Sequence, residues 1–86
     1  MQIQFHANFE KRFRKLSEKL KEKTRGALEK FFKDPFHPSL KNHALHGELE
    51  GKRAFSVTGN LRVIFEEHEN YFLVIMLDVG THSQVY

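Results

Sequence analysis

The sequence predicts one small α+β domain over residues 1–86, in which a short antiparallel sheet carries a helical hairpin on one face. Two observations lead to this fold class. Apolar residues recur at helical spacing only in the first 33 residues, whereas from residue 53 onward they alternate with polar ones. Between these halves stand Pro35 and Pro38, which cannot continue a helix. The expected order is one strand, two helices and three strands.

The N-terminal part predicts a short strand and then the hairpin. Ile3 and Phe5 alternate with polar neighbours, which is typical of a strand. Asn8 is a candidate N-cap for the first helix and Ser17 for the second. The residues expected to face inward are Phe9, Phe13, Leu16 and Leu20, and then Ala27, Leu28, Phe31 and Phe32. One uninterrupted helix over residues 8–33 is the alternative.

The C-terminal part predicts strands joined by short turns. Gly47 and Gly51 bound a short strand or turn. Gly59 and Asn60 form a tight turn, and residues 68–70 form another. The three main strands are expected over residues 53–58, 61–67 and 71–79.

Composition excludes several classes of protein. The chain has no cysteine, so disulfides, thiolate zinc sites and a cysteine nucleophile are excluded. Its six histidines form no His-x-x-x-His helix pair, and we expect no metal site. No apolar run approaches the roughly 18 residues that would span a membrane. We therefore expect a cytoplasmic protein without a membrane partner.

Positive charge is concentrated in the helical half. Residues 1–33 hold ten Lys or Arg and four Glu, whereas residues 34–86 hold four Lys or Arg and seven Asp or Glu. A basic surface of this kind favours a polyanion or an acidic protein as partner. Lys11, Lys15 and Lys19 are the candidate docking residues. The alternative is that these side chains only solvate the helices.

Three motifs carry a family resemblance. They are LHGxLxGxR at residues 45–53, NLRVIF at 60–65 and DVGTHSxVY at 78–86. In this order and spacing they resemble the RelE/ParE toxin superfamily, and the closing Gly-Thr-His-Ser is most similar to its YafQ branch. The resemblance implies a toxin of a toxin–antitoxin pair that cleaves mRNA on the ribosome and is silenced by a cognate antitoxin protein.

The resemblance also implies site residues. His82 matches the C-terminal catalytic histidine, Tyr86 the aromatic residue behind it, and Arg62 the strand arginine of RelE-like toxins. His43 falls where YafQ-like toxins carry their first active-site histidine, and Arg53 lies near a basic position of RelE-like members. The chain departs from YafQ-like toxins at Ser56 and Asn60, where they carry His and Asp.

Metal-free RNA cleavage gives these residue types defined tasks. The substrate's 2′-hydroxyl attacks the adjacent phosphorus, so the enzyme must move two protons and stabilise added negative charge. His82 suits proton transfer near neutral pH, and His43 is the candidate second acid or base. Tyr86 is expected to stack on a base or to assist proton transfer. The candidate RNA- and phosphate-binding residues are Arg62, Arg53, Lys52, Ser56 and Asn60.

Adjacent final strands would bring His82, Arg62 and Tyr86 to one edge of the sheet, within about 10 Å. Two simpler readings remain beside this one: His82 as an ordinary surface residue, and Arg62 paired with Glu66 or Asp78. Two alternative functions also remain. One is a ParE-like inhibitor of DNA gyrase, and the other is a toxin homologue that binds antitoxin without catalysis.

Overall fold

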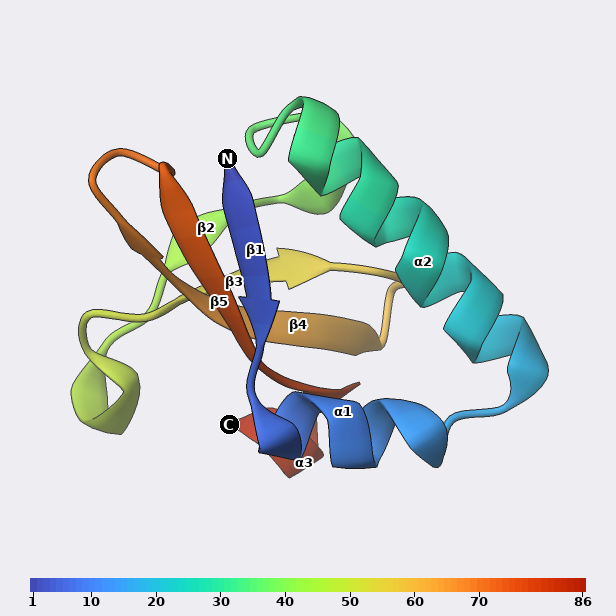
Figure 1. Cartoon of the computed structure of the whole chain (residues 1–86). Coiled ribbons are helices and arrows are strands. Elements are labelled where there is room, and N and C mark those ends of the chain that lie inside the picture. The colour runs from blue at the N-terminus through green and yellow to red at the C-terminus, as the bar shows by residue number, and fades with distance from the viewer.

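The computed structural model describes residues 1–86 as a five-stranded mixed sheet with helices packed against it (Figure 1). The strands lie in the order β1-β5-β4-β3-β2. Their bounds are Gln2–Phe5 for β1, His43–Ala44 for β2, Arg53–Ser56 for β3, Leu61–His68 for β4 and Leu73–Thr81 for β5. The α-helices are α1 at Ala7–Arg14, α2 at Glu18–Lys33 and α3 at His82–Val85, and short 3₁₀ turns form at Pro38–Leu40 and Gly47–Leu49.

One strand pair corrects the expected antiparallel sheet. β1 runs parallel to β5, with Gln2 beside Leu73 and Phe5 beside Met76. All other neighbouring strands are antiparallel, as expected. A parallel pair needs a long connection between its strands. The whole chain between β1 and β5 provides that connection, and alternation of apolar residues alone does not distinguish the two directions.

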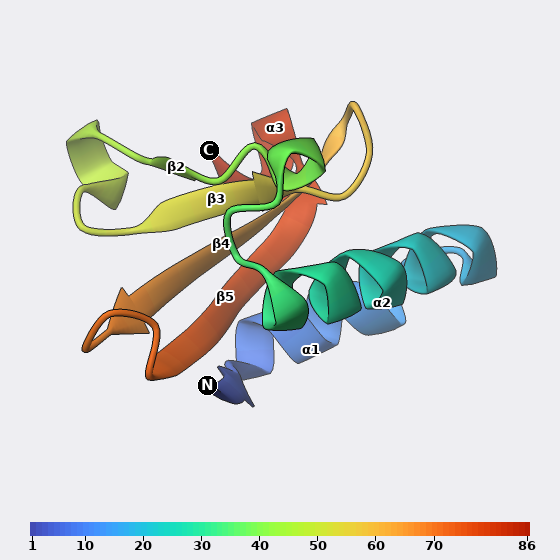
Figure 2. The same ribbon diagram turned by 90° about the horizontal axis from the view of Figure 1, so that it is seen from above.

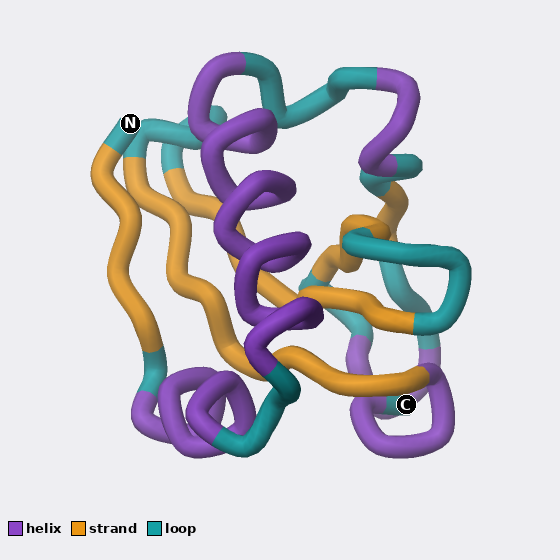
Figure 3. Tube along the Cα trace, turned by 90° about the vertical axis from the view of Figure 1, so that its right-hand side faces the viewer, coloured by secondary structure: helices purple, strands orange, loops and turns teal.

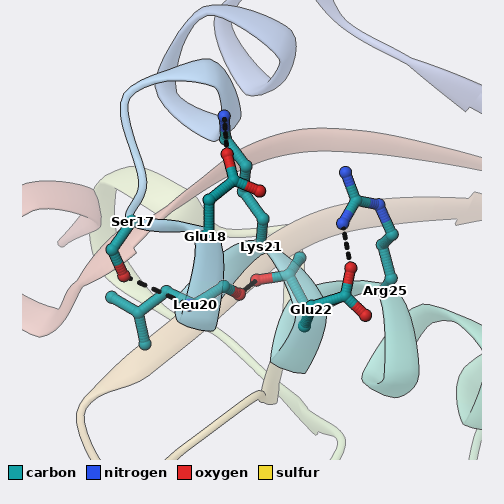
Figure 4. A network of polar contacts seen from close by, with 7 residues as sticks. Ser17, Glu18, Leu20, Lys21, Glu22 and Arg25 are labelled. Carbon is teal, nitrogen blue, oxygen red and sulfur yellow. Dashed lines mark hydrogen bonds and ion pairs between the residues drawn. The ribbon is translucent and has the colours of Figure 1, made fainter.

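The helical hairpin is confirmed, and the single long helix is wrong. Ser17 stands between α1 and α2, and its Oγ accepts a hydrogen bond from the backbone N–H of Leu20 at 3.2 Å (Figure 4). The cap of α1 differs from the expected one. His6, rather than Asn8, occupies the N-cap position, and its Nδ1 accepts from the Asn8 N–H at 3.0 Å.

The main core lies between the sheet and the helices. Figures 2 and 3 show α2 lying across one face of the sheet. Phe31 of α2 is fully buried, and its ring centroid lies 4.8 Å from that of Phe55 and 4.9 Å from that of Phe65. Phe32 was expected to face inward but is 55% exposed, because the next position along a helix points about 100° away.

Strand alternation divides the sheet residues between two faces. Phe55 faces α2, so Ala54 and Ser56 face away from it. The opposite face carries a small cluster of its own, formed by the buried residues Leu45, Ala54 and Ile64, with Val85 of α3 packed against it. The sheet thus has a second, thinly covered face, and the candidate site develops there.

Several boundaries differ from those expected from the sequence. β5 begins at Leu73 instead of residue 71, because Glu69, Asn70 and Tyr71 all adopt left-handed backbone conformations in the turn. Helix α3 follows β5 directly and was not expected. Among the three α-helices, none is long and apolar enough to cross a bilayer.

Candidate active site

A capping box holds the short helix α3 at the end of β5. The Thr81 side chain accepts from the backbone N–H of Gln84, and Gln84 Oε1 accepts from the backbone N–H of Thr81 at 2.8 Å. Gly80 allows α3 to pack closely at this point. A Cβ at that position would lie 2.8 Å from Gln84 Oε1 and 3.1 Å from Val85 Cγ1. The absence of a side chain at residue 80 therefore lets Gln84 and Val85 of α3 pack closely against the end of β5.

His82 and Tyr86 contact each other on this helix. Their ring centroids are 4.4 Å apart with the ring planes at 86°, an edge-to-face arrangement. The Tyr86 N–H also donates to the His82 carbonyl at 3.0 Å. Partial burial raises the pKa of the Tyr86 phenol above its ordinary value, and the positive charge of Arg62 offsets only part of this rise. The phenol therefore stays protonated at neutral pH and can donate a hydrogen bond.

Arg62 approaches the same place from β4. It lies opposite Gly80 in the sheet register, two residues before His82. Its Nη1 donates to the carbonyls of Thr58 at 3.0 Å and Gly59 at 3.2 Å, in the turn between β3 and β4. Carbonyl groups orient the guanidinium without neutralising it, so its positive charge remains available to an anion.

The alternative reading, in which Arg62 pairs with Glu66 or Asp78, is wrong. Asp78 instead forms an ion pair with Arg12 of α1, with 3.3 Å between Asp78 Oδ1 and Arg12 Nε. Glu66 lies 3.9 Å from the Lys52 ammonium and 3.3 Å from the His68 ring. Both carboxylates therefore lie beside cationic side chains other than Arg62.

Ser56 and His43 extend the site along the same face. Ser56 pairs with Arg62 in the register, and His43 pairs with Ala54, so all of them face away from α2. His43 Nδ1 lies 2.8 Å from the Lys41 carbonyl oxygen. Because a carbonyl only accepts hydrogen bonds, Nδ1 carries a proton, and Nε2 of the neutral ring keeps its lone pair. Such a ring is ready to accept a proton at Nε2.

Two other expected phosphate ligands, Asn60 and Lys52, make no hydrogen bond or ion pair with His82, Tyr86 or Arg62. Asn60 is exposed in the β3–β4 turn, where its N–H donates to Thr58 Oγ1 at 3.2 Å. Lys52 is drawn toward Glu66.

Arg53 does not join the site. It stands opposite Phe65 and therefore on the α2 face, where its Nε donates to Asn42 Oδ1 at 2.9 Å. Its guanidinium also lies 5.9 Å from the centre of the Phe36 ring. These contacts give Arg53 a structural role, and strand alternation explains its place: residues 53 and 62 end on opposite faces.

A basic groove runs between α1 and α3. It has a volume of about 380 Å³ and is lined by Asn8, Lys11, Arg12, Lys15, Leu16, Val79 and Gln84. Lys11 and Lys15 thus reach the neighbourhood of the His82 helix, whereas Lys19 does not line the groove. Sequence reasoning missed Gln84, although Thr-x-x-Gln at residues 81–84 is the pattern of a capping box. No group of three or more His, Asp or Glu residues is placed to hold a metal ion.

Comparisons with known proteins identify the family and the fold. A sequence model for "Bacterial toxin of type II toxin-antitoxin system, YafQ" matches residues 1–86. The structure of YafQ from E. coli strain BL21(DE3) superposes with a TM-score of 0.80 at 20% identity, covering 98% of this chain and 96% of that one. A YoeB/ParE toxin from Agrobacterium tumefaciens gives 0.78 at 14% identity, covering 95% and 99%.

The toxin–antitoxin complex RelBE2 of Mycobacterium tuberculosis contains a chain with a TM-score of 0.64 at 17% identity, covering 94% of this chain and 96% of that one. No curated protein sequence matches the chain. At these identities the structural likenesses establish the fold, and the family match covers the full length.

Proposed function

The chain belongs to the YafQ toxin family of type II toxin–antitoxin systems, and on that premise we propose that it is an endoribonuclease that cleaves mRNA on the ribosome. The observation that carries the proposal is the proximity of His82, Tyr86 and Arg62 where the start of β4 lies beside the end of β5 and helix α3. A protein that acted only by binding would need no such group of proton-transfer and phosphate-binding side chains.

The proposed reaction uses the substrate's own 2′-hydroxyl. A bond forms between the 2′-oxygen and phosphorus while the bond from phosphorus to the 5′-oxygen breaks. His43 Nε2 accepts the proton of the 2′-hydroxyl, and protonated His82 donates one to the departing 5′-oxygen. The products are a 2′,3′-cyclic phosphate and a free 5′-hydroxyl.

Arg62 and Tyr86 support this reaction by electrostatics and position. The guanidinium of Arg62, already oriented by two carbonyls, stabilises the charge that develops on the phosphorane. Tyr86 contributes a neutral phenol as donor and an aromatic ring as a platform for a base. Ser56 lies beside Arg62 and supplies a hydroxyl where YafQ-like toxins carry a histidine.

Charge supports the proposed partners. The basic groove between α1 and α3 lies beside the site and suits the RNA backbone, which is a dense polyanion. The same surface suits an acidic antitoxin, which would then compete with the ribosome. Both partners place the protein in the cytoplasm.

A second candidate is a toxin homologue that binds its antitoxin without cleaving RNA. Ser56 and Asn60 favour it, because they replace two side chains capable of proton transfer. In this case expression of the protein would leave mRNA intact.

Induced expression in bacteria, with mapping of mRNA 5′ ends, tests the proposal. The expected result is codon-phased cuts that His82→Ala reduces about 10²–10⁴-fold, because one acid–base group is lost. His68→Ala, an exposed histidine near the far end of β4, is the matched control and should cut normally. Intact mRNA with broken DNA would instead indicate gyrase inhibition, and intact mRNA and DNA would indicate the inactive homologue.

A further inference from the structure

A second groove lies between the C-terminal residues of the chain and the segment that connects β2 to β3. It has a volume of about 470 Å³, within the range of roughly 300–1,000 Å³ that small-molecule sites occupy. Its lining residues are Leu45, His46, Glu48, Leu49, Val85 and Tyr86. The proposed reaction uses only Tyr86 of this set.

Four of the six residues that line the groove are hydrophobic, and three of these belong to a small apolar cluster. Leu45 is buried, and Leu49 and Val85 pack with it on the small cluster of Ala54 and Ile64. The 3₁₀ turn Gly47–Leu49 closes one side, and a left-handed conformation at Gly47, with φ of 71°, sets its start. A flat apolar group that entered here would lie against aliphatic side chains and the Tyr86 ring.

The lining of the groove includes one acidic residue. Glu48 is exposed and has no hydrogen-bond or ion-pair partner, whereas nearby Glu50 lies 3.9 Å from His46 Nδ1. This negative charge distinguishes the groove from the basic one on α1. It would repel a phosphate, but it leaves room for a neutral ring that offers N–H donors.

We propose that this groove binds a nucleobase of the RNA substrate next to the scissile phosphate, and that Glu48 selects bases with an exocyclic amino group. The inference rests on the proposed endoribonuclease function. Arg62 and His82 would hold the phosphate beside Tyr86. Because Tyr86 also lines the groove, the attached nucleotide can reach it. The base then packs against Leu49, Val85 and Tyr86.

Selectivity follows from hydrogen-bond chemistry. A carboxylate only accepts hydrogen bonds, so it pairs with the amino group of cytosine, adenine or guanine. Uracil differs from cytosine by an oxygen in place of that amino group, and two acceptors repel. Glu48→Gln removes this discrimination while keeping shape and size, because a glutamine amide can both donate and accept.

Cleavage on ribosomes provides the first test. The mRNAs would carry cytosine or uracil at one codon position at a time and be otherwise identical. The native chain should favour cytosine about 10-fold at one position, since hydrogen bonds to charged groups are the stronger ones. Glu48→Gln should bring that ratio close to one. Glu50→Gln is the matched control, since Glu50 lies outside the groove, and it should keep the native ratio. A cytosine preference that Glu48→Gln leaves unchanged would overturn the assignment, as would the absence of any preference.

Binding without cleavage provides the second test and separates the two proposals. Methyl NMR of the full chain would follow Leu45, Leu49 and Val85 during titration with cytidine or uridine monophosphate. Larger shifts with the cytidine nucleotide, lost in Glu48→Gln, would support the groove even if the native chain cut no mRNA. Unshifted methyl groups with both nucleotides would refute it, whatever the cleavage assay shows.

Discussion

Replacing Gly80 by alanine tests how α3, the helix that carries His82, is held in place. The new Cβ would lie 2.8 Å from Gln84 Oε1, 3.1 Å from Gln84 Cβ and 3.1 Å from Val85 Cγ1. Gly80 does not need a left-handed backbone, so the substitution adds no backbone strain. The cost must therefore come from displacing the Gln84 side chain or α3 as a whole.

The magnitude follows from what α3 would lose. If Gln84 swings away, its bond to the Thr81 N–H is broken, and the loss of a helix cap costs typically about 1 kcal/mol. Displacing half-buried Val85 from its cluster adds a fraction of the roughly 1.5–3 kcal/mol gained by fully burying such a side chain. We expect a loss of about 1–2 kcal/mol in the free energy of unfolding. Cleavage should fall further, about 10²-fold, because His82 is displaced from Tyr86 and small misplacements of catalytic groups are costly.

The assay combines thermal unfolding with cleavage of mRNA on ribosomes. Gly26→Ala is the matched control, because no atom lies within 4 Å of the added Cβ in the exposed part of α2. It should gain up to about 1 kcal/mol from helix propensity and cut normally. Gln84→Ala removes the closest contact, so adding Gly80→Ala to that variant should cost less than it costs alone. Full cleavage by a folded Gly80→Ala chain would refute the claim that this packing positions His82.

Two further outcomes follow from charges in and beside the site. The pKa of Tyr86 is raised on folding, so the neutral phenol stabilises the fold below pH 10.0, and this contribution is lost as pH rises through the folded-state pKa. Above about pH 10, the unfolding free energy of the native chain should therefore fall relative to that of Tyr86→Phe, and parallel curves of the two chains against pH would contradict the shift. Charge reversal in the groove beside α3, by Lys11→Glu and Lys15→Glu, should weaken ribosome binding and lower its salt dependence. Lys19→Glu, outside the groove, should have a smaller effect on both. Equal effects of all three reversals would mean that the groove is not a specific docking surface.

The core and the order of elements could be predicted from the sequence because both depend on repeated spacing. The recurrence of Phe9 and Phe13 fixes one face of α1, and alternation in β3 separates Phe55 from Ala54 and Ser56. A regular spacing is still recognisable when single residues depart from it, because several apolar residues indicate the same buried face. Strand direction has no such signal, which is why the parallel pairing of β1 with β5 could not be read from the chain.

The end of the chain was harder to predict for a different reason. Helix α3 contains four residues, too few for a period, and its stability comes from the Thr81–Gln84 capping box and from Val85 on the sheet. His82 and Tyr86 could be named as candidates, but their mutual contact depends on this one turn of helix.

The two arginines show most clearly how a fold selects among similar residues. Arg53 and Arg62 both lie in strands between apolar neighbours, and sequence position makes either one a plausible phosphate ligand. In the sheet, Arg53 stands opposite Phe65 on the α2 face and bonds to Asn42, whereas Arg62 stands opposite Gly80 on the other face. The absence of a side chain at Gly80 leaves space beside Arg62, and α3 fills this space with Gln84 and Val85. One glycine therefore permits the turn that carries His82 and Tyr86 back toward the arginine on the neighbouring strand.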